Sequence, residues 1–563
     1  MKKMRLHQQM FRMKALPYFV GIAGAALMAS TAQAQITNNI TIGNAKALGL
    51  AHAVTADPPG VDSIHFNPAG LAKIKGRERQ LKFLMAHMQL DAKFGAQEVD
   101  DLRKAYNDLI DARGGAGDSC AVNPDQSKCF QMDPVQNTKS STADAALILP
   151  GIGLTSVPAL AVPFGGIAIE DPDYGWTFAT AFYSPQAVGY EREKDDPAAY
   201  NGYMVSVSRL TYFAPSIGLQ VNDELSVGAS IGFSWQGMGI KTKFRAPEQT
   251  LQFLAGTMSG LDQSIQDVLD LSLIGPYETV GDLELELDNP LSLSFNLGAL
   301  WEPEDWLAFG FAYTSESTTT LEGDFKMINS DEFLATMNSL KHTPLLGAAL
   351  GLLGGTSQIN AQKIEKGSVE LDYKVPQTVN FGTSIRIVPK LKFNMDLKWV
   401  DYKIWNSLDF KFDRNVDFLN LASVIETIAG QNDSDPDALR IPRGYKSVWS
   451  SAYGFEYQFD DAIVLRAGYE PRASSVPKNR VDLLLPIASA DLYTLGAGYQ
   501  IDKYSRADIG IGYMVSSFKA RAGQSENANS NTAGDVVYNP YSHMSFSAKT
   551  TAILFAASLE QQF

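Results

Sequence analysis

Histidines are the first residues to examine for catalytic chemistry, because imidazole is the commonest general acid or base in enzymes. Beyond residue 34 the chain has five of them: His52, His65, His87, His342 and His543. None belongs to an H-E-x-x-H pair, no serine lies in a G-x-S-x-G turn, and no phosphate-binding loop is present. The segment His543-Met544-Ser545 is a poor match to the catalytic pair of a lipase. The sequence therefore predicts a protein that is not an enzyme and that has no cofactor.

The only cysteines are Cys120 and Cys129. No further cysteine or histidine follows them at the spacing of a zinc site, so no metal is predicted. Two cysteines are also too few for a scaffold held together by disulfides. Because the pair is close in sequence and an export signal precedes it, we expect one disulfide within a loop rather than two free thiols.

The export signal occupies residues 1–34. It combines five basic residues, a short apolar stretch at 15–29 and the cleavage motif Ala32-Gln33-Ala34. A membrane anchor is the weaker alternative, because the apolar stretch is short. The formal net charge is −15 for the whole chain. It becomes about −20 without the signal, which argues against binding to nucleic acid.

The strongest pattern after the signal is an alternation of apolar and small or polar residues with a period of two. No later stretch reaches the roughly 18 apolar residues that a membrane-spanning helix needs. The alternation is clear in 225–236, 291–301, 391–399 and 453–459. Successive side chains of a strand point to opposite faces, so each segment has one apolar face and one polar face. A soluble all-β sandwich would alternate in the same way.

Three features favour a transmembrane barrel over a sandwich. Many strands span about ten residues or more, as a tilted strand across a bilayer does. Aromatic residues cluster near strand ends, where an interfacial girdle would lie: Trp235, Trp301, Trp306 and Trp399. Tight turns such as 222–224 and 389–390 alternate with long connections, which is typical of outer-membrane barrels. The long connections are 95–145, 246–283, 326–367, 413–446 and 521–545.

The predicted fold is an all-β, transmembrane antiparallel barrel of about fourteen strands over residues 80–563. An even number of strands favours one strand at 202–222, containing Pro215, rather than two. The chain ends in an alternating strand that closes on Phe563. This strand resembles the one that outer-membrane barrels present to their assembly machinery, which we expect as a partner.

A barrel of this size has a lumen that strand side chains alone do not fill. Residues 35–79 precede the first strand and are rich in Ala, Gly and Asn. We expect them inside the lumen as an N-terminal hatch, which argues against a polar-solute porin. The segment Asn67-Pro68-Ala69-Gly70 has the residue types of a turn, and an ordinary turn before the first strand is the simpler interpretation of these residues alone.

Basic side chains at lumen-facing positions are candidates to bind a carboxylate ligand. Arg386, Lys398 and Arg466 occupy such positions in the alternating strands. Polar barrel interiors are normal, so the alternative is that these residues pair with acidic residues of the lumen or the hatch.

Several motifs occur in an order that matches a known family: Gly43–Gly49, Phe66–Leu71, Pro215–Leu219, Asn222–Gly228 and Ser475–Arg480. With these motifs, essentially the whole exported chain resembles the long-chain fatty acid outer-membrane transporter family, of the FadL type, with its aromatic-hydrocarbon relatives. The Asn-Pro-Ala-Gly-Leu element is the most specific of them. The insertion 95–145 and the extended loops 326–367 and 413–446 depart from the family pattern and concern the external mouth.

The resemblance implies a hatch inside a fourteen-stranded barrel, with the hatch segment Asn67-Pro68-Ala69-Gly70 beside a kink in the third strand. That strand contains Tyr183-Ser184-Pro185, where proline removes a ladder donor, so this segment is the predicted wall opening. Asn67 offers both a donor and an acceptor across such a gap. The alternative is that Pro185 merely ends the strand.

The resemblance also implies an apolar external groove that captures the ligand first. In 246–283 the apolar residues have helical spacing: Leu251, Leu254, Met258 and Leu261. In 326–367 they are Phe333, Met337 and Leu340. The alternative is that these helix faces are buried against each other.

The function that the resemblance implies is passive uptake of hydrophobic compounds across the bacterial outer membrane, with lateral release into outer-membrane lipid. Long-chain fatty acids are the best-supported ligands. Uptake of alkanes or aromatic hydrocarbons is the alternative, and a polar-solute porin or an outer-membrane lipase has less support.

Overall fold

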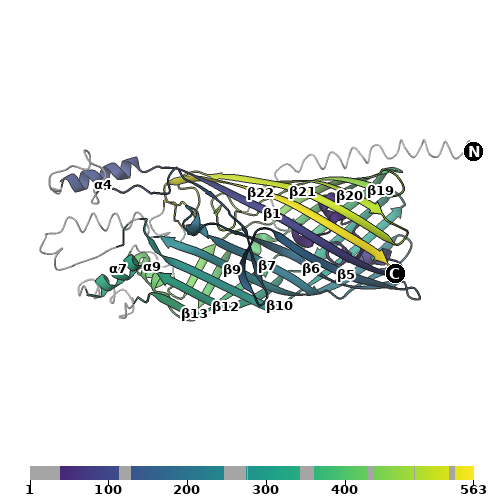
Figure 1. The fold of residues 1–563 in the computed structure, drawn as a ribbon, viewed down its shortest axis with the longest axis horizontal. Coiled ribbons are helices and arrows are strands. Elements are labelled where there is room, and N and C mark those ends of the chain that lie inside the picture. The colour runs from purple at the N-terminus through teal and green to yellow at the C-terminus, as the bar shows by residue number, and fades with distance from the viewer. Residues whose placement is uncertain are drawn as a thin grey trace, which may run out of the picture.

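The computed structural model describes residues 39–112, 129–245, 274–275, 277–342, 361–428, 435–486, 488–531 and 539–563. The predicted signal lies outside these residues. Most of the described residues form one long sheet, which closes because the first strand pairs with the last along most of its length. Figure 1 shows the resulting barrel with its long axis horizontal. The predicted all-β barrel is confirmed.

Around the wall, the described residues provide fourteen strand positions, as predicted, and five of these consist of two consecutive segments. In chain order the wall strands are β1 (Arg77–Gln97), β5 (Leu160–Asp171), β6 (Trp176–Glu191), β7 (Met204–Phe213) with β8 (Ser216–Gln220), β9 (Leu225–Arg245), β10 (Thr279–Glu304), β11 (Leu307–Thr314) with β12 (Ser317–Asn329), β13 (Ile364–Val375) with β14 (Thr378–Val388), β15 (Leu391–Val400) with β16 (Ser407–Phe412), β17 (Ala438–Pro442) with β18 (Val448–Gln458), β19 (Ile463–Arg472), β20 (Ala490–Gln500), β21 (Ser505–Ala520) and β22 (Met544–Gln562).

The break between β7 and β8 shows how 202–222 is organised. Both segments pair with β6 on one side and with β9 on the other. Pro215 lies between them, where its missing N–H interrupts the ladder for only a short distance. The segment therefore occupies a single wall position, which confirms the prediction.

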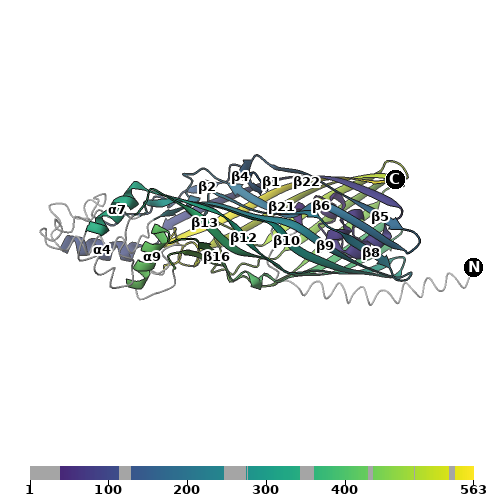
Figure 2. The ribbon, with the colours of Figure 1, turned by 90° about the horizontal axis from the view of Figure 1, so that it is seen from below.

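The two ends of the barrel differ. Tight turns join neighbouring strands at the end that holds the C-terminus, on the right in Figure 1. We call this the lower end and the opposite one the upper end. The upper end carries α4 (Asp100–Ala112), α7 (Asp331–His342) and α9 (Asp417–Ile428), which lie in the predicted long connections (Figure 2). Near it, β2 (Lys139–Ser141) pairs with β1, while β3 (Ala145–Leu149) and β4 (Gly153–Val157) form a separate hairpin. None of the helices in the described ranges is long and apolar enough to cross a membrane.

The apolar face of the wall changes sides partway along the barrel, and β10 shows how. Its odd-numbered apolar residues at 291–297 are 47–50% exposed, whereas Leu283, Leu285 and Leu287 are 1–3% exposed. Between these two sets, the pairing of β10 with β9 shifts register from Asn289 to Ser292. One extra residue moves every side chain beyond it to the other face of the sheet. Odd positions of β10 therefore face outward below this bulge and into the lumen above it.

The upper lumen is apolar. The largest cluster of buried apolar side chains gathers inward-facing residues of the upper wall together with residues of α7 and α9. The outward positions of β10 in the same region are acidic: Asp282, Glu284, Glu286 and Asp288. A charged outer face does not suit lipid, so the band that faces the bilayer belongs to the lower half.

Residues 39–76, the described part of the predicted hatch, fill the lower lumen. Their helical segments are short: η1 (Ile40–Ile42), α2 (Ala45–Gly49), η2 (Gly60–Asp62), α3 (Ser63–Phe66) and η3 (Pro68–Lys73). Figure 1 shows them enclosed by the wall toward the C-terminal end. Their apolar side chains form two buried clusters with the wall, so the hatch is packed like a protein core.

We expect the folded protein to be heat-modifiable in SDS gel electrophoresis. A closed barrel satisfies its backbone hydrogen bonds internally, so SDS at room temperature leaves it compact, and boiling unfolds it. Unheated samples should migrate faster than boiled ones, and their circular dichroism in detergent should be dominated by strand. Identical migration of the two samples would contradict the closed barrel.

Candidate functional site

The wall has a gap between β5 and β6. These strands pair only from Asp171 opposite Trp176 to Gly165 opposite Phe182. Above Phe182, β6 continues to Glu191 and pairs with β7, with one isolated bridge from Glu191 to Asp144, while the upper residues of β5 pair with β1 alone. Two neighbouring strands thus separate partway up the barrel, and their facing edges are left without each other's hydrogen bonds.

Pro185 lies where this gap begins. The pairing of β6 with β7 shifts register between Tyr183 and Gln186, which places Ser184 and Pro185 in a bulge within the strand. The idea that Pro185 merely ends the strand is therefore wrong. Proline has no N–H, so it leaves no donor unpaired at this position. The kink that the resemblance implied for the third strand is present in the third wall position.

The hatch satisfies part of the backbone at the bulge. The Thr41 hydroxyl donates a hydrogen bond of 2.9 Å to the carbonyl of Ser184. The Ser184 hydroxyl donates across to the carbonyl of Arg209 on β7, at 2.8 Å. Just below, the ring of Tyr183 contacts the ring of His65 in the hatch, with 5.4 Å between centroids. The first described residues of the hatch therefore lie directly behind the gap.

The β3–β4 hairpin covers the gap. Just before β3, the amide of Thr142 donates to Leu90 on β1 and the amide of Ala143 donates to Glu191 on β6, so the chain crosses here from β1 to β6. Within β3, the amide of Ile148 donates to the hydroxyl of Ser206 on β7. These contacts place the hairpin across the opening.

Leu147 of β3 reaches residues on the lumen side of the wall. It packs in one buried cluster with Leu84, Leu160 and Phe164. Beside it lies a small cavity of about 60 Å³. Apolar side chains of the hatch, β1, β3, β6, β21 and β22 line most of this cavity, among them Ile40, Met88, Leu147, Val188, Met514 and Leu554. The gap therefore connects an apolar space inside the barrel with the inner side of the hairpin.

The segment Asn67-Pro68-Ala69-Gly70 docks on a different part of the wall. The Asn67 amide donates to the carbonyl of Thr55 in the hatch at 2.8 Å and to that of Ala299 on β10 at 3.0 Å, and its side-chain oxygen accepts from the Ala69 amide. Asn67 therefore does not bond across the gap, contrary to our expectation. Thr41 makes that contact. Asn67 instead ties the hatch to β10.

Close approach of the hatch to the wall depends on glycines in the wall. A Cβ atom at Gly298 would overlap the side-chain oxygen of Asn67, and one at Gly228 on β9 would overlap the backbone of Pro68. The hatch segment therefore lies against bare backbone, and any side chain at these two positions would push it inward.

Charged side chains also hold the hatch. Lys82 on β1 pairs with Asp62 at 2.5 Å in a buried position, and the partly exposed Lys392 on β15 pairs with Asp57 at 2.8 Å. The Asp396 carboxylate of β15 accepts hydrogen bonds of 3.0 Å from the amides of Val54 and Thr55. Breaking such buried contacts leaves unpaired charges, so displacement of the whole hatch is costly.

Two of the three basic residues predicted to bind a carboxylate ligand are already paired. Lys398 lies 3.3 Å from Glu470. Arg466 lies 2.7 Å from Glu456 and 2.6 Å from Asp508. These findings confirm the alternative interpretation for both. Arg386 is exposed beside a lower turn, far from the upper lumen along its strand, and its backbone amide donates to Trp306.

Arg209 is a buried lumen cation that sequence analysis missed. It is 4% exposed, and its Nε and Nη2 atoms have no hydrogen-bond partner among the described residues. Gln186 on β6 and Gln236 on β9 lie directly opposite it, so no carboxylate flanks it in the sheet. Its position in the sequence could have identified it. Arg209 lies at an odd position in the alternating stretch 205–211, on the same face as the buried Val205 and Val207.

Arg209 lies at the boundary between two environments. Thr211, two residues below on the same face, pairs with Tyr183 in the hatch cluster. Val207, two residues above, belongs to the apolar cluster of the upper lumen. The guanidinium is within electrostatic reach of the phenols of Tyr183 and Tyr373. A polar head beside Arg209 would therefore have an apolar region directly above it.

The predicted external groove is only partly described. Phe333 and Met337 on α7 are buried in the apolar cluster of the upper lumen, at 0% and 3% exposure, so they do not line an open groove. Leu251, Leu254, Met258 and Leu261 lie outside the described residues, and the side chain of Leu340 is not described. Cys129 is disulfide-bonded. Cys120 lies outside the described ranges, so the predicted pairing stays a prediction.

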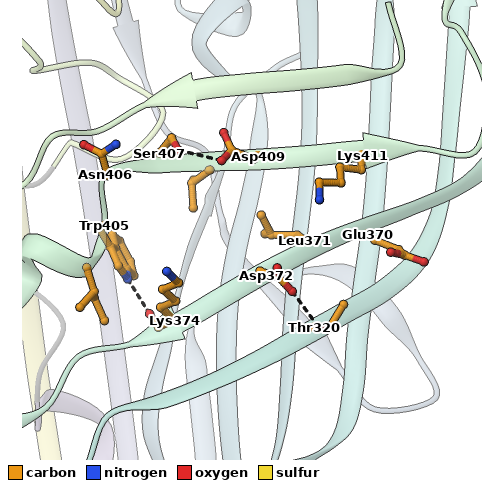
Figure 3. A pocket seen from close by; sticks show the side chains of 12 residues that line it. Thr320, Glu370, Leu371, Asp372, Lys374, Trp405, Asn406, Ser407, Asp409 and Lys411 are labelled. Carbon is orange, nitrogen blue, oxygen red and sulfur yellow. Dashed lines mark hydrogen bonds between the residues drawn. The ribbon is translucent and has the colours of Figure 1, made fainter. Parts of the chain in front are cut away.

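Figure 3 shows a further pocket, of about 310 Å³, where β13 and β16 diverge in the upper wall. The indole of Trp405 donates to the carbonyl of Lys374 at one side of it. Its charged side chains have both signs: Glu370, Asp372, Lys374, Asp409 and Lys411. Such a lining does not suit an apolar ligand.

A closed barrel with a packed hatch, an apolar upper lumen and a covered gap in its wall belongs to the class of transport barrels for apolar compounds. The family model "Outer membrane protein transport protein (OMPP1/FadL/TodX)" matches residues 22–563. The chain belongs to this family and is an outer-membrane transporter of hydrophobic compounds. A comparison with curated proteins found no significant match.

Solved structures share the fold at low sequence identity. A FadL homologue from Pseudomonas aeruginosa is 15% identical, with a TM-score of 0.59, over 95% of this chain and 100% of that one. The toluene transporter TodX from P. putida is 12% identical, with a TM-score of 0.54, over 92% and 98%. The toluene transporter TbuX from Ralstonia pickettii is 14% identical, with a TM-score of 0.53, over 93% and 99%.

We expect Gly298→Ala to loosen the hatch, because its methyl group would occupy the space of the Asn67 oxygen. Overpacking of this kind costs about 1–3 kcal/mol. The measurement is the sensitivity of cells to a large polar antibiotic, together with proteolysis of the hatch in purified protein; both should increase. Gly232→Ala is the matched control, since a Cβ there would meet only the ends of the Ser294 and Thr211 side chains closely and no hatch atom. Equal effects of the two variants would contradict the docking role.

Proposed function

We propose that the protein takes up long-chain fatty acids passively and releases them sideways into the outer membrane through the gap between β5 and β6. The observation that carries the choice of ligand is Arg209, a buried cation without a carboxylate partner among the described residues, directly below an apolar lumen. A monocarboxylate with a long apolar tail has one group for each of these environments.

The energetics of binding suit such a ligand. Each buried CH₂ group contributes about 0.8 kcal/mol, so a tail of around fifteen carbons supplies on the order of 10 kcal/mol. A carboxylate beside Arg209 adds a charge-assisted hydrogen bond and gives a partner to a guanidinium whose burial is otherwise costly. No energy source is needed for capture from dilute solution.

Release is the harder step for a ligand of this kind, and the gap offers a route for it. Moving the tail into water would forfeit the burial energy, whereas moving it into lipid would not. Unpaired backbone facing lipid is costly, and here the hatch residue Thr41 and the β3–β4 hairpin satisfy part of the edge. The hairpin and η1 are therefore the elements that would move, while the ion-paired body of the hatch stays in place.

Uptake of aromatic hydrocarbons is the second candidate. It is favoured by the structural likeness to TodX and TbuX, which are described as toluene transporters. An aromatic hydrocarbon offers Arg209 only the face of its ring, so this function would leave the guanidinium without an anionic partner.

We expect Arg209→Gln to weaken binding of a C16 fatty acid by about tenfold to a hundredfold, the worth of one hydrogen bond to a charged group. Binding of the C16 alcohol should change little, because the alcohol has no charge to lose. Arg209→Lys should retain part of the preference, and Arg386→Gln, which removes an exposed arginine, is the control. The measurement is titration of purified protein with both ligands. An equal loss for acid and alcohol would argue against a carboxylate partner.

Locking the hatch to the bulge tests the lateral route. Thr41→Cys with Ser184→Cys places two thiols where the hatch meets β6, and oxidation should reduce uptake of a fluorescent fatty acid at least tenfold. A reductant should restore uptake in this variant, while wild-type cells given the same treatments report any effect of the native disulfide. Undiminished uptake in cells shown to carry the oxidised pair would favour a straight path through the lumen.

A further inference from the structure

A basic patch lies on the outer face of the upper wall, on β1, β2, β21 and β22. We define it by the exposed, outward-facing lysines Lys93, Lys139, Lys519 and Lys549. Among the described residues, none of the four forms an ion pair with a carboxylate. The nearest acidic residue along the ladder, Asp91, lies opposite Lys549 but accepts its hydrogen bonds from Ser141 and Gln89.

The register brings like charges together. Lys93 lies directly opposite Lys139 on one side and opposite Ser547 on the other, and Ser547 lies opposite Lys519. Three lysines therefore occupy one line of four cross-strand neighbours. Like charges directly opposite each other destabilise a sheet unless an anion lies between them. This arrangement points to a negatively charged ligand on the outer face.

A hollow at the edge of the patch adds two more cations. β20 begins at Ala490, whereas β21 continues to Ala520, so the upper edge of β21 faces the connection between β19 and β20 across a cavity of about 1000 Å³. The cavity is lined by the basic residues Lys478, Lys519 and Arg521, with Ser489 and Ser517 beside them. The described residues of its lining include no carboxylate.

The height of the patch fits a lipid head group. Tyr469, Tyr493 and Tyr513 form an exposed cross-strand row, and Ile553 lies next in the same line. Tyrosines at such positions mark the membrane interface. Lys549 lies four residues above Ile553 on β22, which is about 13 Å along the strand and about 10 Å along the axis of a barrel tilted at 35–45°. Lysine side chains here reach the layer of head groups just above the aromatic row.

The opposite wall has a different charge pattern. There, Lys241 and Lys243 of β9 lie opposite Glu284 and Asp282 of β10, so basic residues are matched by acidic neighbours. The chain as a whole has a net charge of −15. On the patch side, Lys93, Lys139 and Lys519 have no acidic cross-strand neighbour among the described residues. This is a local feature of an acidic protein and does not reflect its composition.

We propose that this wall binds the phosphate groups of a phosphorylated glycolipid of the outer leaflet, the lipid A type. Clusters of lysine and arginine next to an apolar membrane band bind anionic head groups, and phosphate is a strong acceptor for lysine. The acyl chains would lie against the exposed apolar residues of β21 and β22 below the lysines, including Ile511, Tyr513 and Ile553. The inference concerns the lipid around the barrel and does not depend on which compound is transported.

The test is a lipid-binding titration of the full-length protein in detergent, read by native mass spectrometry. The probes are lipid A with its phosphates, the same lipid after removal of the phosphates, and inorganic phosphate as a competitor. The variant K93E/K519E/K549E reverses the charge of three of the four patch lysines, and K93Q/K519Q/K549Q neutralises the same three without adding acid. The control K241E/K243E changes lysines on the opposite wall, and heat-modifiable migration verifies that each variant is folded.

The wild type and the control should bind phosphorylated lipid A at least fivefold more tightly than the dephosphorylated form, and both patch variants should lose this preference. Binding of a C16 fatty acid should stay unchanged in every folded variant, which separates this result from a failure of the proposed transport function. Equal binding of the two lipids, or an undiminished preference in the folded glutamine variant, would overturn the proposal. Displacement of the lipid by millimolar inorganic phosphate would assign the patch to a free anion and would overturn it as well.

Discussion

Every backbone N–H and C=O that faces lipid must find a partner within the protein, and this constraint organises the whole molecule. It requires a sheet without free edges, so β1 pairs with β22 and the wall closes. Closure with fourteen strands creates a lumen that the wall does not fill, and the hatch occupies its lower half. The same constraint explains why the separation of β5 from β6 is small, contains a proline, and is covered by Thr41 on one side and the β3–β4 hairpin on the other.

The bulge at Asn289 to Ser292 of β10 lies at the height where the barrel changes from one environment to another. Below it, apolar side chains face the bilayer and polar ones hold the hatch; above it, apolar side chains face the lumen and charged ones face water. The ligand therefore passes from an apolar lumen to an apolar membrane at the height where the wall changes sides. Arg209 and the gap both lie in this region, between the cluster of the hatch and the cluster of the upper lumen.

Much of the fold was predictable because the period of two is visible in the residues themselves. Strand number, closure, tight turns at one end and a packed N-terminal segment all followed from it. The switch of the apolar face of β10 from the outside to the lumen was not predictable. The leucines of β10 stay at odd positions on both sides of Asn289-Pro290, and only the pairing with β9 reveals the extra residue. The role of Arg209 was not predictable either. Lys398 and Arg466 have the same pattern, and only the contacts show that these two pair with carboxylates and that Arg209 does not. Thr41 was missed because a short contact to a carbonyl has no sequence signature.

The glycines that face the hatch have a consequence for how this protein can evolve. Gly298 and Gly228 accommodate Asn67 and Pro68, and around the wall Gly310 faces Thr55, Gly454 faces Leu50 and Gly510 faces Ala45. The hatch thus fits against wall positions where glycine leaves room for it. A larger side chain in the hatch is tolerated only where the wall has space, and a side chain added to the wall requires a compensating change in the hatch. The two parts are bound to vary together, while the upper rim, which is not part of this fit, is free to diversify its loops.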